Sequence, residues 1–79
     1  MIRVLFFGPV ADRIGSREMT LDYSGGMALH DVMHKVGMQH PGALSIVSFI
    51  AVNQQQVHDR QMVLRDNDEV ALMAKFSGG

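Results

Sequence analysis

The sequence predicts a two-layer α+β domain with the β-grasp arrangement, in which one main helix packs on one face of a mixed sheet. Three observations support this fold class. The 79 residues are enough for a single domain. The predicted order is strand, strand, helix, strand, short strand, strand, and one helix covers only one face of a sheet. Residues 53–68 also lack the helical spacing for the second crossover helix that a ferredoxin-like fold requires.

The first two strands are expected to form a hairpin with a long loop. Residues 2–7 are apolar except for Arg3 and rich in β-branched and aromatic side chains. This pattern predicts a strand in the middle of the sheet, buried on both faces. Residues 10–15 fit one turn of helix or a compact loop that Gly15 closes. Residues 17–23 alternate between apolar and polar side chains, which predicts a half-exposed strand at an edge.

The main helix is predicted from four apolar residues at helical spacing, which are Leu29, Val32, Met33 and Val36. This spacing gives a helix of about three turns with one buried stripe. Ser24 is a candidate for capping its start. Either Gly37 or Gly42 is expected to end it, since Pro41 lies between them.

The remaining strands follow the helix. Residues 44–52 form the most apolar stretch and predict a second interior strand. Residues 53–55 predict a turn, residues 56–58 a short strand, and residues 65–68 another turn. Residues 69–74 predict the last strand. With the first and last strands central and parallel, the arrangement is the ubiquitin-like β-grasp, in a single domain over residues 1–79.

Composition excludes several classes of function. The net charge is −1 and no basic patch is evident, which argues against binding of nucleic acid. The absence of cysteine excludes disulfides, thiol catalysis and thiolate metal sites. No stretch approaches the roughly 18 apolar residues of a membrane span. We therefore expect a soluble, cytoplasmic protein that associates with neither nucleic acid nor membranes.

The domain shows no pattern typical of a metal, cofactor or catalytic site. His30 and His34 have the spacing of two ligands on one helix, but no third ligand is evident, and they are expected to be exposed. Asp66, Asp68 and Glu69 fall in or beside a turn, where acidic residues are common. We expect the chain itself to bind no metal and no cofactor.

The candidate functional segment is the C-terminus, where residues 76–79 are expected to form a flexible Gly-Gly tail. Gly78 and Gly79 have no side chains, so their backbone can enter a narrow channel. Such a tail, from Phe76 to Gly79, reaches about 13 Å at about 3.3 Å per residue. A terminal carboxylate is a poor electrophile until it is activated. Adenylation by ATP supplies a leaving group, and attack by sulfide or persulfide then gives a thiocarboxylate. A frayed end without function is the alternative.

Three motifs resemble the MoaD/ThiS family of sulfur-carrier proteins, and most closely its MoaD branch. Residues 2–8 (IRVLFFG) are similar to the family's first strand. Residues 51–54 (AVNQ), followed by Val57, resemble its central strand and turn. Residues 64–70 (LRDNDEV) resemble its Leu-x-Asp-Gly-Asp-Glu-Val turn, with Asn67 at the glycine position. Asn accepts a left-handed backbone, so this substitution is mild.

The resemblance implies the small subunit of molybdopterin synthase, which carries sulfur to a pterin precursor in molybdenum cofactor biosynthesis. Gly79 would be adenylated and converted to a thiocarboxylate, and Gly78 would give access to it. An adenylating enzyme similar to ubiquitin-activating enzymes would use ATP and Mg²⁺, and a sulfurtransferase would supply the sulfur. The large subunit would hold the catalytic groups, so the carrier alone would turn nothing over. Docking on partners is expected at residues near the tail, which are Phe76, Ser77, Phe6 and Leu72.

Three alternatives remain open from the sequence. The first keeps the carrier chemistry but serves thiamine synthesis or another thiolation pathway. The second is a ubiquitin-like protein modifier, in which the Gly79 carboxyl forms an isopeptide bond with a lysine. The third is a binding module in which the two glycines are incidental. Residues 73–75 stand where many MoaD-type proteins have a proline-containing stretch, which leaves the pathway open.

Overall fold

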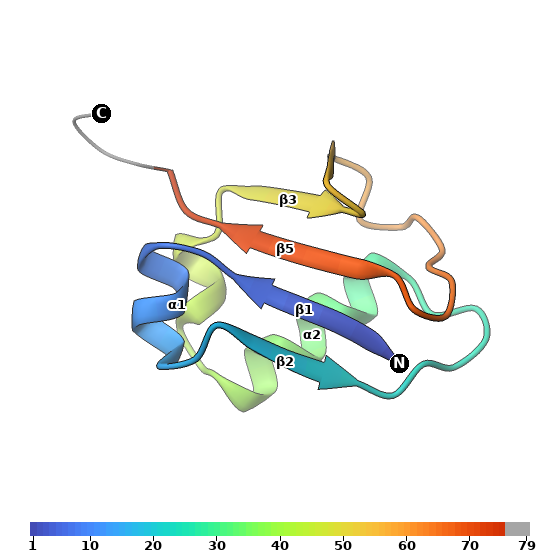
Figure 1. Cartoon of the computed structure of the whole chain (residues 1–79), viewed down its shortest axis with the longest axis horizontal. Coiled ribbons are helices and arrows are strands. Elements are labelled where there is room, and N and C mark those ends of the chain that lie inside the picture. The colour runs from blue at the N-terminus through green and yellow to red at the C-terminus, as the bar shows by residue number, and fades with distance from the viewer. Residues whose placement is uncertain (76–79) are drawn as a thin grey trace.

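The computed structural model describes residues 1–75, which form a five-stranded mixed sheet with α2 packed behind it (Figure 1). The strands are β1 (Ile2–Phe6), β2 (Glu18–Leu21), β3 (Phe49–Val52), β4 (Gln55–Val57) and β5 (Glu69–Met73). The helices are α1 (Pro9–Ile14), α2 (Leu29–Gln39) and the 3₁₀ helix η1 (Ala43–Ile46). The strand order is β2-β1-β5-β3-β4. This arrangement confirms the predicted β-grasp fold class.

The first and last strands pair in parallel at the centre of the sheet, as predicted. β2 is an edge strand and forms the predicted antiparallel hairpin with β1, with α1 in the long connection. The registers place Leu5 beside Ala71, and Ala71 beside Ala51. These three residues therefore form one row across β1, β5 and β3, on one face of the sheet.

The hydrophobic core lies between the sheet and α2. None of its largest contributors is more than 3% exposed; from the strands these are Ile2, Val4, Phe6, Val70 and Leu72, and from α2 they are Leu29, Val32, Met33 and Val36. The buried stripe predicted for the main helix is thus confirmed. Complete burial of one such aliphatic side chain stabilises the fold by about 1.5–3 kcal/mol.

Two predictions about the strands are wrong. β1 is buried on one face only, because Arg3 is exposed and Leu5 is half-buried. The strand predicted over residues 44–52 begins only at Phe49, since the first part of this apolar run forms η1 and packs against both α1 and α2. Composition does not distinguish a short buried strand from a short buried helical turn, because both are made of consecutive apolar residues.

The ends of α2 also differ from the expectation. The N-terminal turn is capped by Asp31, whose Oδ2 accepts a hydrogen bond from the Ala28 N–H at 2.9 Å, and not by the Ser24 side chain. The helix continues through Gly37 to Gln39. Gly42 follows with φ of 88°, a left-handed conformation that turns the chain into η1.

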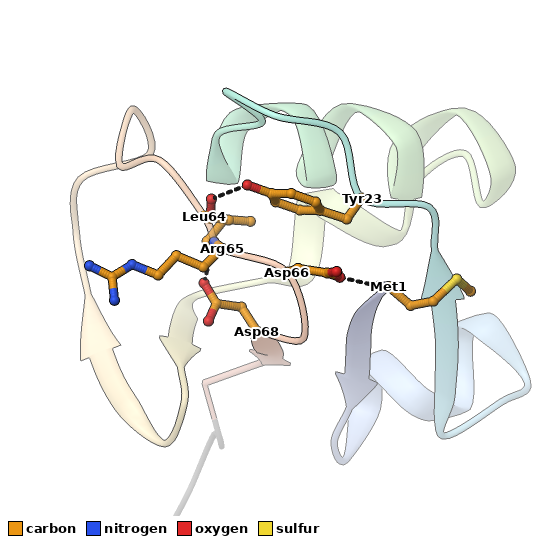
Figure 2. Close-up of polar contacts among 6 residues, drawn as sticks. All are labelled: Met1, Tyr23, Leu64, Arg65, Asp66 and Asp68. Atoms are coloured by element: carbon orange, nitrogen blue, oxygen red, sulfur yellow. Dashed lines mark hydrogen bonds and ion pairs between the residues drawn. The ribbon is translucent and has the colours of Figure 1, made fainter.

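Two turns at one end of the sheet contain non-glycine residues with positive φ. Asn53 and Gln54, at 52° and 69°, connect β3 to β4, and Asn67, at 72°, precedes β5. The Asn53 amide joins the two turns: its Nδ2 donates to Asp68 Oδ1 at 3.0 Å, and its Oδ1 accepts from the Glu69 N–H at 3.0 Å. The other Asp68 oxygen accepts from the Arg65 N–H at 2.8 Å (Figure 2).

We predict that Asn67→Val destabilises the protein by about 1–2 kcal/mol, because a β-branched residue is strained at positive φ. Asn67→Gly is the matched variant. Glycine adopts the same positive φ without strain, but it also has more conformational freedom in the unfolded chain. The two effects oppose each other, so the free energy of unfolding of the Asn67→Gly variant stays within about 0.5–1 kcal/mol of that of wild type. Urea denaturation of the three proteins checks this. Equal stability of the Val and Gly variants would contradict the left-handed turn.

The N-terminus is held at the same end of the sheet. The Met1 ammonium donates to Asp66 Oδ1 (Figure 2). The Asn67 N–H donates to the Met1 carbonyl at 3.0 Å. Nearby, the Tyr23 hydroxyl donates to the Leu64 carbonyl at 3.2 Å. The hydrogen bond and the positive charge of the ammonium lower the pKa of Asp66 below its ordinary value of 3.8. The folded state therefore favours the ionised carboxylate.

This lowered pKa gives a dependence of stability on pH with a definite sign. The stabilisation is present above the pKa of Asp66 in the unfolded chain, and it is lost as the pH falls through the lower pKa of the folded state. We predict that wild type loses more thermal stability than Asp66→Asn between about pH 5 and about pH 2. Asp22→Asn is the control. Parallel curves for wild type and Asp66→Asn would contradict the ion pair.

Candidate functional site

One face of the sheet is left uncovered by residues 1–75, and we call it the open face. In Figure 1 it is turned toward the viewer, with α2 behind the sheet and α1 beside the end of β1. Because side chains alternate along a strand, it carries the residues between the core positions. They are Arg3, Leu5 and Phe7 at β1, Glu18 and Thr20 on β2, Phe49 and Ala51 on β3, and Glu69, Ala71 and Met73 on β5.

Three large apolar side chains lie side by side where β1 and β5 end, and we call Phe7, Met73 and Phe49 the apolar row. Phe49 pairs with Met73 across β3 and β5. The Phe7 N–H donates to the Leu72 carbonyl at 3.2 Å, which brings Phe7 beside Met73. Phe7 is 47% exposed and Phe49 is 40% exposed. At about 4.8 Å between strands the row spans about 10 Å, and Leu5, Ala71 and Ala51 extend it along the sheet.

A shallow depression continues the apolar row toward α1. It measures about 450 Å³, and its lining includes Leu5, Phe7, Ala11 and Arg17. The lining also contains Asp12 and Glu18, so the open face is apolar from β3 to Leu5 and Phe7 and becomes charged toward α1. Exposed aromatic side chains beside a hollow are typical of surfaces that bind another protein.

The tail continues from this same end of the sheet. β5 ends at Met73, the Ala74 side chain still packs into the core at 6% exposure, and Lys75 is exposed. Gly78 and Gly79, expected to react, and Phe76 and Ser77, expected to dock, lie outside the described residues. The described chain thus leads to the candidate reactive residues from beside the apolar row.

Phe6 and Leu72, two of the residues expected to dock on a partner, are core residues. They are 2% and 0% exposed, so their side chains offer no surface to a partner. The Phe6 ring instead lies edge-on to the His40 ring, with centroids 6.4 Å apart. The accessible residues are their neighbours, the exposed Phe7 and the half-buried Met73, because moving by one residue along a strand changes the face. Sequence reasoning also missed Phe49, whose segment was assigned to a buried strand.

Within residues 1–75, no group of three or more His, Cys, Asp or Glu side chains is placed so that it could hold a metal ion. His30 and His34 are exposed on α2, as expected. None of the helices within residues 1–75 is long and apolar enough to cross a membrane.

The different burial of neighbouring residues gives a third stability prediction. Leu72→Ala removes a fully buried side chain and leaves a cavity, so it should cost about 2–5 kcal/mol of unfolding free energy. Phe7→Ala removes a half-exposed ring and should cost less than about 1 kcal/mol. Chemical denaturation measures both. A larger cost for Phe7→Ala than for Leu72→Ala would reverse the assignment of core and open face.

Comparison with known proteins identifies relatives along almost the whole chain. The model of the ThiS family matches residues 4–79. The "Molybdopterin synthase sulfur carrier subunit" of Chlamydomonas reinhardtii is 31% identical over 81 residues, which cover 99% of this chain and 98% of that protein.

Solved structures show the same fold. SAMP1 from Haloferax volcanii superposes with a TM-score of 0.85 at 22% identity, covering 99% of this chain and 98% of that one. In the complex of subunits 1 and 2 of molybdopterin-converting factor from Helicobacter pylori, the matching chain has a TM-score of 0.67 at 23% identity, covering 99% of this chain and 97% of that one. The resemblance found in the sequence is confirmed, and the chain belongs to the ThiS family.

Proposed function

We propose that this chain is the sulfur-carrying small subunit of a molybdopterin synthase. The observation that supports this most is the similarity to the Chlamydomonas carrier subunit, which runs over nearly the full length of both proteins. The sequence has Gly78-Gly79 as its last two residues, and the described chain leads to them from beside the apolar row. The family, the sequence of the tail and the exposed apolar row therefore all favour the role of a sulfur carrier.

In this role the Gly79 carboxylate is the reacting group. A carboxylate oxygen attacks the α-phosphate of ATP, supplied with Mg²⁺ in an adenylating enzyme, and pyrophosphate leaves. Sulfide then attacks the acyl carbon, AMP leaves, and the thiocarboxylate remains; with the persulfide of a sulfurtransferase as the nucleophile, a thiol reductant must afterwards cleave the resulting acyl disulfide to give the same thiocarboxylate. Gly78 has no side chain, so the backbone that presents Gly79 stays thin. The carrier supplies the acyl group, and the enzymes supply the catalytic groups.

The apolar row is the surface that we assign to docking on the large subunit. The Helicobacter pylori structure is itself a complex of subunits 1 and 2, which supports a partner of this kind. Exposed aromatic side chains are frequent anchors at protein interfaces. If fully extended, the four residues 76–79 would span about 13 Å. Docking at the apolar row would therefore let the thiocarboxylate enter a neighbouring active site that holds the pterin precursor.

Mass spectrometry of the intact protein tests this function. After incubation with its adenylating enzyme, ATP, Mg²⁺ and a sulfur donor, the protein should gain the mass of one oxygen-to-sulfur exchange, located on Gly79. Deletion of Gly79 should abolish the gain, whereas Gln61→Ala, in a loop away from the tail, should keep it. The product should then convert the pterin precursor when the large subunit is added.

Two results would contradict the proposal. Persistence of the plain carboxylate under these conditions would exclude the carrier chemistry. Accumulation of lysine conjugates, seen as a ladder of larger species on a denaturing gel, would instead indicate a protein modifier.

A further inference from the structure

The chain passes from β1 to α1 through one tight turn directly after Phe7. The Val10 N–H donates to the Phe7 carbonyl at 3.2 Å, and Gly8 has φ of 54° and ψ of −130°. Pro9, the next residue, is the first residue of α1. A hydrogen bond across four residues, with such angles at the second of them, defines a type II′ β-turn over residues 7–10.

Glycine is the residue that this turn requires at position 8. Positive φ at the first central residue of a type II′ turn favours glycine, because a residue with a Cβ is strained there. Pro9 adds a second restriction, since proline favours extended backbone with negative φ and positive ψ in the residue before it. An L-alanine in place of Gly8 would therefore favour the opposite sign of both angles, and the turn would open.

The turn fixes the backbone of Phe7 on both sides. The Phe7 N–H donates to the Leu72 carbonyl of β5 at 3.2 Å, and the Phe7 carbonyl accepts the bond from Val10 within the first turn of α1. The Gly8 carbonyl accepts from the Asp12 N–H at 3.1 Å, so the same residue also anchors the helix. Phe7 is therefore held between the sheet and α1.

Among the three members of the apolar row, Phe7 depends most on a turn. Met73 and Phe49 lie within β5 and β3, where they pair with each other. Phe7 lies one residue beyond the end of β1 at Phe6, and it is the member of the row that also lines the depression. A side chain that is already held in its bound position loses less conformational freedom on binding. The orientation of the Phe7 ring thus affects how tightly a partner docks.

We propose that Gly8 is a positioning residue of the docking surface, because its type II′ turn holds the Phe7 ring in the orientation that the large subunit binds. Gly8 acts through Phe7 and makes no contact of its own with the partner. This inference rests on the proposed function, since it requires a large subunit that docks on the apolar row.

The experiment measures the dissociation constant for the cognate large subunit, at a temperature at which thermal unfolding shows each variant to be folded. Gly8→Ala should weaken binding about three- to ten-fold, as expected for partial loss of an aromatic anchor. A protein with D-alanine at position 8 should bind within about two-fold of wild type, because a D-residue favours positive φ. Chemical synthesis gives access to this protein, since the chain has only 79 residues.

A double-mutant cycle shows whether Gly8 acts through Phe7. Phe7→Ala should weaken binding about ten-fold or more. Adding Gly8→Ala to it should change the dissociation constant by less than about two-fold, because the ring that the turn positions is gone. Gly25→Ala is the matched control and should bind like wild type. The φ of Gly25 is not positive, and an added Cβ meets no atom beyond its chain neighbours within 4 Å.

Gly8→Asn is a milder variant, since Asn accepts positive φ more readily than Ala. Its affinity should lie between those of Gly8→Ala and wild type. It takes the place of Gly8→Ala in the cycle if the alanine variant does not fold.

Three outcomes would overturn the inference. Additive effects of Phe7→Ala and Gly8→Ala would show that Gly8 affects binding independently of the ring. Equal weakening by L-alanine and D-alanine at position 8 would show that an added methyl group, and not the turn, is responsible. Wild-type affinity of both Gly8→Ala and Gly8→Asn would show that the turn does not position the anchor. If the wild type itself does not bind the large subunit, the proposed function fails instead.

Discussion

The parallel pairing of β1 with β5 is the constraint on which the rest of the structure depends. Two parallel strands cannot be joined by a tight turn, so the chain needs a long connection, and α2 within it covers one face of the sheet. Parallel strands also end at the same edge. This places Phe7 beside Met73, at the point where the chain continues toward Gly79. The apolar row and the start of the tail are therefore products of one pairing.

A single main helix also decides which side chains remain available to a partner. The helix covers the face of β1 that carries Val4, and nothing in residues 1–75 covers the other face. Apolar residues on that open face lose their contact with water only when another protein packs on them. Association with the proposed partner would add a further layer on the open face, and the favourable contribution to its free energy would be burial of apolar surface.

Much of the fold was predictable because its signals are local, whereas the assignment of faces depends on the layers. The helical stripe at Val32 and the turn at Asn67 follow from spacing and residue type within a few positions. β1 is apolar on both faces, so its pattern does not show which side meets the helix, and Phe6 was assigned to the surface in place of Phe7. Arg3 was a usable signal, because a charged residue in an interior strand indicates an uncovered face.

The polar contacts at the end of the sheet opposite the start of the tail also determine which side chains of β5 lie on the open face. Asn53 holds the start of β5 through the Glu69 N–H, and its own N–H donates to the Glu69 carbonyl at 2.8 Å, so the register of β5 against β3 is set there. A slip of one residue would move Leu72 to the open face and Met73 into the core, since side chains alternate. It would also remove Glu69 from Arg3. The turn between β3 and β4 therefore maintains both the apolar row and the ion pair between Arg3 and Glu69.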